Sequence, residues 1–363
     1  MFEVAQYAPL IHTRISEVRG LRELPDSTKD LILPLFVLRP WPRAKALQVA
    51  FDRMTEATGG RKFGIDLESE FPQANSENIA QVEFDALRNP ANGFANYYEK
   101  VGQVDGAVPV LQLTGEIAEL PLQVERIQAI GRGGFVRITK NNAEHNEQVA
   151  AAIENLPAGD FSIFIDAGWQ RDILQQSAWA VDMAQYYFDQ TPDRAIVICG
   201  SSFPIDFAKV NGSSAFSINE RLLFTQVRNS LNANFIYGDW ASTRPPSYDY
   251  DIRRTVPRID LAQTAEWPVY RSRKIQKQNE NGDLELVWES YKDVAIRLVD
   301  GQYWDTIPAI WGRYAIECTA DDLPNSIKSP MIAAATRVNL HLHMQSHFNT
   351  PELLGNTDDP YID

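Results

Sequence analysis

The sequence is poor in cysteine and has no stretch typical of a secreted or membrane-spanning chain. Its 363 residues include two cysteines, Cys199 and Cys318, too few for a disulfide framework and suited to a reducing compartment. Cys199 ends an apolar run, which predicts a small buried side chain. Met1–Leu10 contains neither a basic segment nor a long apolar one, so we expect no signal peptide. No run approaches the roughly 18 apolar residues of a membrane span. These absences predict a cytoplasmic protein.

Positive charge is also scarce. The chain has 34 Lys and Arg against 48 Asp and Glu, a formal net charge of -14. Non-specific binding to DNA or RNA depends on neutralising phosphates with Lys and Arg, so we do not expect it from a chain this acidic. For the same reason we expect no binding to anionic membrane surfaces. A local basic patch remains compatible with this total.

What the sequence does contain is a series of eight short apolar runs, separated by helical patterns. The runs are Tyr7–His12, Leu31–Leu38, Phe63–Leu67, Val108–Leu113, Gly134–Ile138, Phe161–Asp166, Arg194–Cys199 and Asn234–Gly238, with the last intervening helix expected near Ser217–Leu231. Runs rich in Val, Ile, Leu and Phe are typical of strands covered on both faces, and their alternation with helices indicates a parallel sheet. Eight units in roughly 230 residues predict an α/β fold, a (β/α)8 TIM-like barrel. An open doubly wound sheet is the alternative, although no Gly-x-Gly-x-x-Gly follows the first run.

The pattern changes after Trp240. Thr243–Asp251 is a loop rich in Pro and Tyr. Two strands, Trp267–Ile275 and Leu284–Tyr291, are expected to form a hairpin across Asn279–Asp283, and helical patterns follow. We therefore predict three parts: the barrel at residues 1–240, a C-terminal α+β region at 241–348 packed on the barrel, and a loose tail at 349–363.

Polar side chains follow the predicted strands at their carboxyl ends, where active sites of such barrels lie. They are His12, Arg14, Arg39, Asp66, Glu68, Gln112, Thr114, Arg137, Lys140, Asp166, Trp169, Ser201, Ser202, Asp239 and Trp240. Asp66, Asp166 and Asp239 are the candidate catalytic acids and bases. Asp66 and Glu68 are two apart on a strand, so they share a face and are candidate ligands for Mg²⁺ or Mn²⁺. The alternative is that Arg and Asp at the strand ends simply neutralise each other.

A phosphate-binding role is expected for a second group of residues: His12, Arg14, Arg39, Arg137, Gly200, Ser201, Ser202 and Trp240. The small residues of Gly200–Pro204 could present backbone N–H groups to phosphate after the seventh strand. The segment is neither a Walker A loop nor a Gly-x-Ser-x-Gly elbow. A plain tight turn is the alternative.

Histidines and aromatic residues near the C-terminus allow two interpretations each. His343 and His347 are four apart and would share a helix face, either as a metal-binding pair or as structural side chains. Aromatic residues gather after residue 239, either as a surface for stacking bases, as a lid, or as a second core: Trp240, Tyr248, Tyr250, Trp267, Tyr270 and Trp288.

Several segments in this order resemble the beta protein family, named after a bacteriophage T4 protein and scattered through bacteria and their mobile elements. They are Tyr7-Ala-Pro-Leu-Ile, Leu33-Pro-Leu-Phe-Val, Gly64-Ile-Asp66, Phe164-Ile-Asp166, Gly200-Ser-Ser-Phe-Pro204, Tyr237-Gly-Asp239-Trp240, Pro257-Arg-Ile259 and Trp267-Pro-Val-Tyr-Arg271. The resemblance spans nearly the whole chain. It departs near the end, where relatives tend to have adjacent histidines after a Trp-Arg pair; here Arg337 lacks the Trp, and Leu342 separates His341 from His343. The resemblance implies an association with phage and bacterial conflict loci, beside nuclease-like or regulatory genes, but no particular reaction.

Three hypotheses follow. The chain is an enzyme acting on a phosphate-bearing substrate such as a nucleotide or a nucleic-acid end, by metal-assisted phosphohydrolase or nuclease-like chemistry. Alternatively, it is a non-catalytic binding or sensor subunit of an antiviral defence system, recognising a protein partner encoded nearby or a nucleotide. The third is a phage-encoded protein that modulates its host without catalysis.

Overall fold

The computed structural model describes residues 5–72, 77–154, 156–157, 159–245, 256–278, 281–355 and 357. The chain divides into two compact units, each made of separate segments. The first comprises Met1–Val18, Lys29–Phe203 and Asn219–Pro246, and the second comprises Arg19–Thr28, Pro204–Ile218 and Ser247–Asp363.

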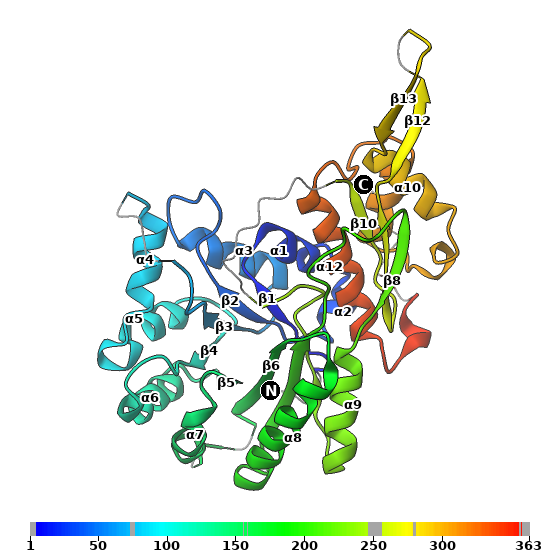
Figure 1. The fold of residues 1–363 in the computed structure, drawn as a ribbon. Coiled ribbons are helices and arrows are strands. Elements are labelled where there is room, and N and C mark those ends of the chain that lie inside the picture. The colour runs from blue at the N-terminus through cyan, green and yellow to red at the C-terminus, as the bar shows by residue number, and fades with distance from the viewer. Residues whose placement is uncertain are drawn as a thin grey trace. The chain divides into compact units, whose positions relative to one another are not determined.

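An eight-stranded parallel sheet forms the centre of the first unit, with helices around it (Figure 1). The strands follow chain order: β1 (Leu10–His12), β2 (Leu35–Leu38), β3 (Phe63–Leu67), β4 (Ala107–Leu111), β5 (Gly134–Thr139), β6 (Phe161–Trp169), β7 (Ala195–Ser201) and β9 (Ile236–Tyr237). The helices of the first 231 residues are α1 (Ile15–Arg22), α2 (Asp26–Lys29), α3 (Gln48–Thr58), α4 (Ile79–Leu87), α5 (Ala91–Gly102), α6 (Leu120–Ile130), α7 (Asn146–Ile153), α8 (Ile173–Gln190) and α9 (Glu220–Leu231). Helices between successive parallel strands cover the sheet, as crossover connections require.

The predicted closed TIM-like barrel is wrong: the sheet is an open half-barrel with β1 and β9 as its end strands. These two strands form no ladder with each other. One parallel bridge, Tyr7 to Tyr237, and backbone hydrogen bonds from Ala8 N and Leu10 N to Tyr237 O and Asp239 O connect their neighbouring residues. A closed barrel needs every strand to pair on both sides. β9 has only two residues and β1 three, and their ladders are with β7 and β2. The strand order has no reversal, so the sheet is not doubly wound either.

One hydrophobic cluster of this unit lies inside the curve of the sheet. It is formed by Ala8, Leu10, Leu33, Leu35, Val37, Val108, Val110, Phe135, Phe164, Val197, Cys199 and Trp240. Successive side chains on a strand point to opposite faces, so residues two apart share the inner face. Cys199 is buried here as a free thiol, which confirms the expectation of a small buried side chain.

Beyond Arg19–Thr28, the described residues of the second unit form two antiparallel sheets and the helices α10 (Tyr291–Val299), α11 (Trp311–Ala320) and α12 (Pro330–Ser346). A three-stranded sheet has the order β10 (Arg258–Asp260), β11 (Glu266–Arg271) and β8 (Ser213–Ser217), and β12 (Lys274–Gln278) pairs with β13 (Leu284–Trp288). Ser290 and Asp293 form a capping box that begins α10, because each satisfies the backbone N–H of the other.

One sequence expectation needs correction near the second unit, and one strand was not predicted. The helix expected from Ser217 begins at Glu220, and Ser217 ends a strand instead. The short Ser-rich strand β8 has no apolar alternation to predict it and forms because β11 pairs with it. Parts of the Thr243–Asp251 loop, the Asn279–Asp283 turn and the 349–363 tail lie outside the described residues.

Candidate functional site

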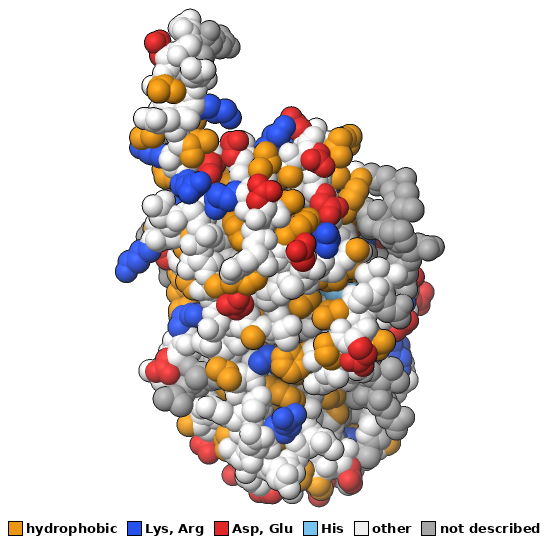
Figure 2. Space-filling model, turned by 90° about the vertical axis from the view of Figure 1, so that its right-hand side faces the viewer, with side chains coloured by type: hydrophobic (Ala, Val, Ile, Leu, Met, Phe, Trp, Pro, Cys, Tyr) orange, Lys and Arg blue, Asp and Glu red, His pale blue; other side chains and the backbone are white. Residues whose placement is uncertain are grey.

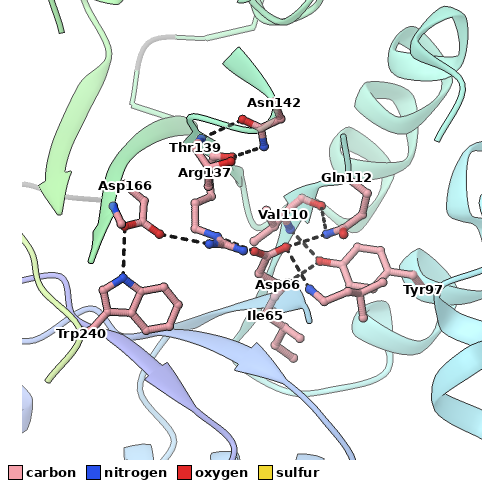
Figure 3. A network of polar contacts seen from close by, with 12 residues as sticks. Ile65, Asp66, Tyr97, Val110, Gln112, Arg137, Thr139, Asn142, Asp166 and Trp240 are labelled. Carbon is pink, nitrogen blue, oxygen red and sulfur yellow. Dashed lines mark hydrogen bonds and ion pairs between the residues drawn. The ribbon is translucent and has the colours of Figure 1, made fainter. Parts of the chain in front are cut away.

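Arg137 stands at the centre of the carboxyl edge of the half-barrel (Figure 3). Its Nε donates to Asp66 Oδ2 at 2.7 Å and its Nη1 to Asp166 Oδ2 at 3.1 Å. Sheet geometry explains this meeting. Phe135 and Phe164 belong to the inner core, so the residues two further on, Arg137 and Asp166, face the same interior one layer nearer the carboxyl ends. The structure therefore brings two of the three predicted acids together, through one arginine.

Further donors hold both carboxylates in place. Gln112 Nε2 and the backbone N–H of Leu67 donate to Asp66 Oδ1 at 3.2 and 2.9 Å. Trp240 Nε1 and the backbone N–H of Gly168 donate to Asp166 Oδ1 at 3.1 and 3.0 Å. All four carboxylate oxygens thus accept hydrogen bonds, as buried ionised groups require.

The ion pairs keep Arg137 charged despite its surroundings. Burial by itself lowers the pKa of Arg137, but the neighbouring Asp66 and Asp166 carboxylates raise it more, so its pKa lies above the ordinary arginine value. Its side chain is 17% exposed, and it lines a pocket at the sheet edge. The guanidinium is therefore a fixed cation with one side toward that pocket.

Hydrogen bonds of Tyr97 and Asn142, which sequence reasoning missed, hold the backbone around these residues (Figure 3). Tyr97 Oη donates to Ile65 O at 2.5 Å and accepts from Val110 N at 2.7 Å. Asn142 accepts from Thr139 N at 2.7 Å and donates to Arg137 O at 3.1 Å. The Tyr97 contacts join β3 to β4, and the Asn142 contacts hold the turn that follows β5 against the end of that strand. No local pattern marks Tyr97 or Asn142, because their partners come from other segments or from the backbone.

Glu68 is the most unusual side chain at this edge. It is 2% exposed, yet neither carboxylate oxygen has a hydrogen-bond partner. Burial raises the pKa of Glu68, and the charges of Arg39, Arg14 and Arg137 act in the opposite direction. A buried carboxylate without a donor is costly, which makes Glu68 a candidate for contact with a ligand.

His12, Arg14, Arg39 and Trp240 lie around the same end of the sheet. A ring nitrogen of His12, Nε2, contacts Arg244 O at 2.9 Å, and its ring centroid lies 4.9 Å from that of Trp240. Burial, then the charge of Arg14, lowers the pKa of His12 well below its ordinary value, so the ring is neutral at physiological pH. Arg14 also lowers the pKa of Arg244, after burial. We call Arg14, Arg39 and Arg244 the arginine group.

The pocket at this edge has a volume of about 670 Å³. Its charged lining comprises five carboxylates against two cations: Asp66, Glu68, Glu70, Glu144, Asp166, Arg137 and Lys140. Trp169 adds an aromatic wall. The pocket is therefore acidic, and none of the arginine group lines it. Glu68 belongs to the pocket and is also within the electrostatic reach of Arg14 and Arg39.

Asp239 and Gly200–Ser202 have other partners. The Asp239 carboxylate accepts hydrogen bonds from the hydroxyls of Tyr7 and Tyr237. Ser202 donates to Glu220 from its backbone N–H at 2.5 Å and from its hydroxyl at 2.6 Å. Sequence reasoning missed Glu220, whose pKa is raised to about 7 by burial and then by Asp239. The phosphate-binding role of Gly200–Ser202 stays a prediction, with a carboxylate beside its backbone.

The predicted metal ligands are not gathered into a metal centre. Among the described residues, no group of three His, Cys, Asp or Glu side chains is placed to hold an ion. His343 and His347 do lie together, with ring centroids 4.7 Å apart. Both ring nitrogens of His343 have partners, Thr28 Oγ1 at 2.8 Å and Leu354 O at 3.0 Å. This geometry is that of a structural histidine. The metal role of Asp66 and Glu68 stays a prediction.

Fold and site together define an α/β half-barrel protein with a charged pocket at the carboxyl edge of its sheet. A family model described as Beta protein matches residues 7–347. The chain belongs to the beta protein family. It is 30% identical over 351 residues to Protein beta of Enterobacteria phage P4, covering 95% of this chain and 94% of that protein.

The family resemblance seen in the sequence is confirmed, with a phage relative from P4 rather than T4. No solved structure is significantly similar to the chain. Within the described part of the chain, no helix combines the length and apolarity needed to cross a membrane.

Proposed function

We propose that this beta-family protein binds a nucleotide at the carboxyl edge of its half-barrel and acts as a ligand-binding component in the conflict between phage and bacterium. One observation carries the proposal. Glu68 is buried without a hydrogen-bond partner, at the point where the acidic pocket comes within reach of the arginine group. Ligands of parallel α/β sheets bind outside the carboxyl ends of the strands, which is where this residue lies.

The two charge environments suit the two ends of a nucleotide. Carboxylates accept hydrogen bonds, so the acidic lining suits the N–H groups of a base, with Trp169 available for stacking. Arginines bind phosphate through several N–H donors, so Arg14, Arg39 and Arg244 suit the anionic end. Inorganic phosphate alone would not match a pocket with an excess of carboxylates. A molecule with donors at one end and an anion at the other does.

Binding is favoured over metal-assisted hydrolysis by the contacts of Arg137. The guanidinium lies between Asp66 and Asp166 and bonds to both, where an ion shared by the two acids would have to lie, and every oxygen of the two carboxylates already accepts a hydrogen bond. A metal ion there would displace a buried cation that the two acids keep charged. Under this proposal, Arg137 keeps the pocket rigid.

The role in conflict between phage and bacterium is supported by the relative from phage P4 alone. We include in the proposal a defence function, a protein partner encoded nearby and a cytoplasmic location. A plaque assay in a bacterium expressing the chain, with wild type beside the Glu68→Gln variant, connects the site to that role. Equal plaque numbers for wild type and Glu68→Gln would mean that the pocket plays no part in any effect on phage.

The binding experiment measures thermal unfolding with nucleoside triphosphates, the matching nucleosides and pyrophosphate. A ligand at about 100 times its Kd stabilises the folded state by roughly 2.7 kcal/mol. We expect a nucleotide to raise the Tm of wild type. Glu68→Gln should lose most of that rise, because its amide offers one acceptor where the carboxylate offers two. Arg14→Gln should reduce the rise in Tm with nucleotides but leave any rise with nucleosides unchanged.

Glu125→Gln is the matched control, because Glu125 is an exposed residue of α6 outside the pocket. It should respond as wild type does. A rise with pyrophosphate equal to that with nucleotides would show a simple anion site and defeat the base-recognition argument. No rise with any nucleotide would sink the proposal. Asp166 is unsuitable for this test because its replacement unbalances Arg137 and disturbs folding.

A further inference from the structure

The β12–β13 hairpin carries an apolar stripe on its outer face. Leu284, Leu286 and Trp288 occupy alternate positions of β13 and are 64%, 61% and 48% exposed. Alternation places all three on one face of the strand. Figure 2 shows the hairpin as a narrow projection that bears hydrophobic side chains beside Lys and Arg. Three adjacent large apolar side chains at such exposure indicate an interaction surface.

The backbone of β13 is also available for pairing. Within the described residues, β13 forms a ladder with β12 and with no other strand. A two-stranded hairpin is marginally stable alone, and an edge strand with exposed apolar side chains is a template for another strand. The stripe and the edge belong to the same five residues, Leu284–Trp288. One strand added beside β13 would cover both.

We propose that β13 pairs antiparallel with β13 of a second copy of this chain, centred on Leu286. In this register Leu286 faces itself and Leu284 faces Trp288, so the stripe meets its own counterpart. Glu285 faces Val287, so no two like charges are directly opposite. The same surface meeting itself gives a closed two-fold pair. The result is a four-stranded sheet with β12 on each outer side.

Charge within the hairpin fits this arrangement. Lys277 lies opposite Glu285 in the ladder, so each copy brings its own cation beside the one carboxylate of the strand. On the apolar face, the residues of β12 opposite the stripe are Gln278, Gln276 and Lys274, and Lys274 Nζ lies 5.8 Å from the centroid of the Trp288 ring. The stripe is thus bordered by polar side chains on its own hairpin, and its open side is the β13 edge.

The test measures the mass of the full chain in solution over a concentration series, for example by sedimentation. Wild type should dimerise reversibly. Leu286→Lys and Leu286→Glu should each dimerise more weakly, with a dissociation constant raised roughly tenfold or more, because like charges would face each other at the centre. A mixture of the two variants should dimerise again, because opposite charges then meet. A merely structural role of Leu286 would not produce this rescue.

Leu323→Lys is the matched control, since Leu323 is 50% exposed in the same unit but outside the hairpin. It should dimerise as wild type does. If wild type stays monomeric to roughly 100 µM, the proposal is wrong, and the partner of the stripe is a different protein. A dissociation constant of Leu286→Lys equal to that of wild type, or a mixture that dimerises no better than each variant alone, would overturn it equally, by placing the contact elsewhere.

Discussion

Glu220 shows how one buried side chain couples the fold to pH. It begins α9 and accepts two hydrogen bonds from Ser202. Burial and the nearby Asp239 raise its pKa from the ordinary value of 4.5 to about 7. The folded state therefore binds a proton more tightly than the unfolded state does. Its contribution to stability is greatest below the unfolded pKa and is lost as the pH rises to about 7.

Replacing this carboxyl tests that coupling. Glu220→Gln cannot ionise, so we expect it to flatten the fall in unfolding free energy between about pH 4.5 and 7. Wild type should lose about 3 kcal/mol of unfolding free energy over this pH range, the equivalent of the pKa shift, and Glu220→Gln should not show this loss. Denaturant unfolding at several pH values measures this. In Glu125→Gln, the unfolding free energy should fall with pH as steeply as in wild type. An equally steep fall in Glu220→Gln would show that Glu220 does not cause this pH dependence.

At the scale of elements, the end strands of the half-barrel approach each other through a glycine. Gly238 follows β9, and a Cβ atom there would lie 2.7 Å from Ala8 O and 2.4 Å from Cys199 Sγ. Ala8 N donates to Tyr237 O in the same region. The absence of a side chain at this position lets the residues before β1 come next to β9. The single bridge between the two edges depends on that closeness.

Gly238→Ala should therefore destabilise the first unit. The Ala8 carbonyl belongs to the backbone and cannot move aside as a flexible side chain would, so we expect a loss of about 1–3 kcal/mol, as for other overpacked cores. Denaturant unfolding measures the loss. Gly102→Ala is the control, because its Cβ would meet Ile130 at an ordinary 3.6 Å. An unchanged free energy in Gly238→Ala would mean that the edges separate readily.

At the scale of the whole molecule, the units are not successive stretches of chain. Arg19–Thr28 and Pro204–Ile218 belong to the second unit, although most of that unit lies after residue 246. β8 from the middle of the chain pairs with β11 at five positions. Asn339 of α12 likewise donates to Gly20 O at 3.0 Å. Segments far apart in sequence therefore complete the second unit together.

This organisation predicts the behaviour of a shortened chain. A chain ending at residue 246 leaves β8 and Arg19–Thr28 without their partners, so unpaired backbone and apolar side chains become exposed. We expect it to aggregate or to bind a hydrophobic dye, and to unfold at a lower Tm than the full chain. Circular dichroism and dye fluorescence measure this. A monomeric 1–246 chain with an unchanged Tm would show that the first unit folds independently of these partners.

The sequence by itself determined the local features of this protein. Apolar runs placed the strands, the ends of those runs placed Asp66, Arg137 and Asp166 at carboxyl ends, and ordered motifs identified the family. These features depend on residues a few positions apart. The free edge of β13 and the burial of Glu68 were not among them.

Only the tertiary structure decided which of those residues meet. In the structure, Arg137 joins Asp66 and Asp166, whereas Asp239 accepts hydrogen bonds from Tyr7 and Tyr237. The structure also left the sheet open where a closed barrel was expected. Closure depends on the length and tilt of the end strands, and ion pairing depends on which inner-face side chains the curvature of the sheet brings within reach. Neither quantity is a property of any short stretch of sequence.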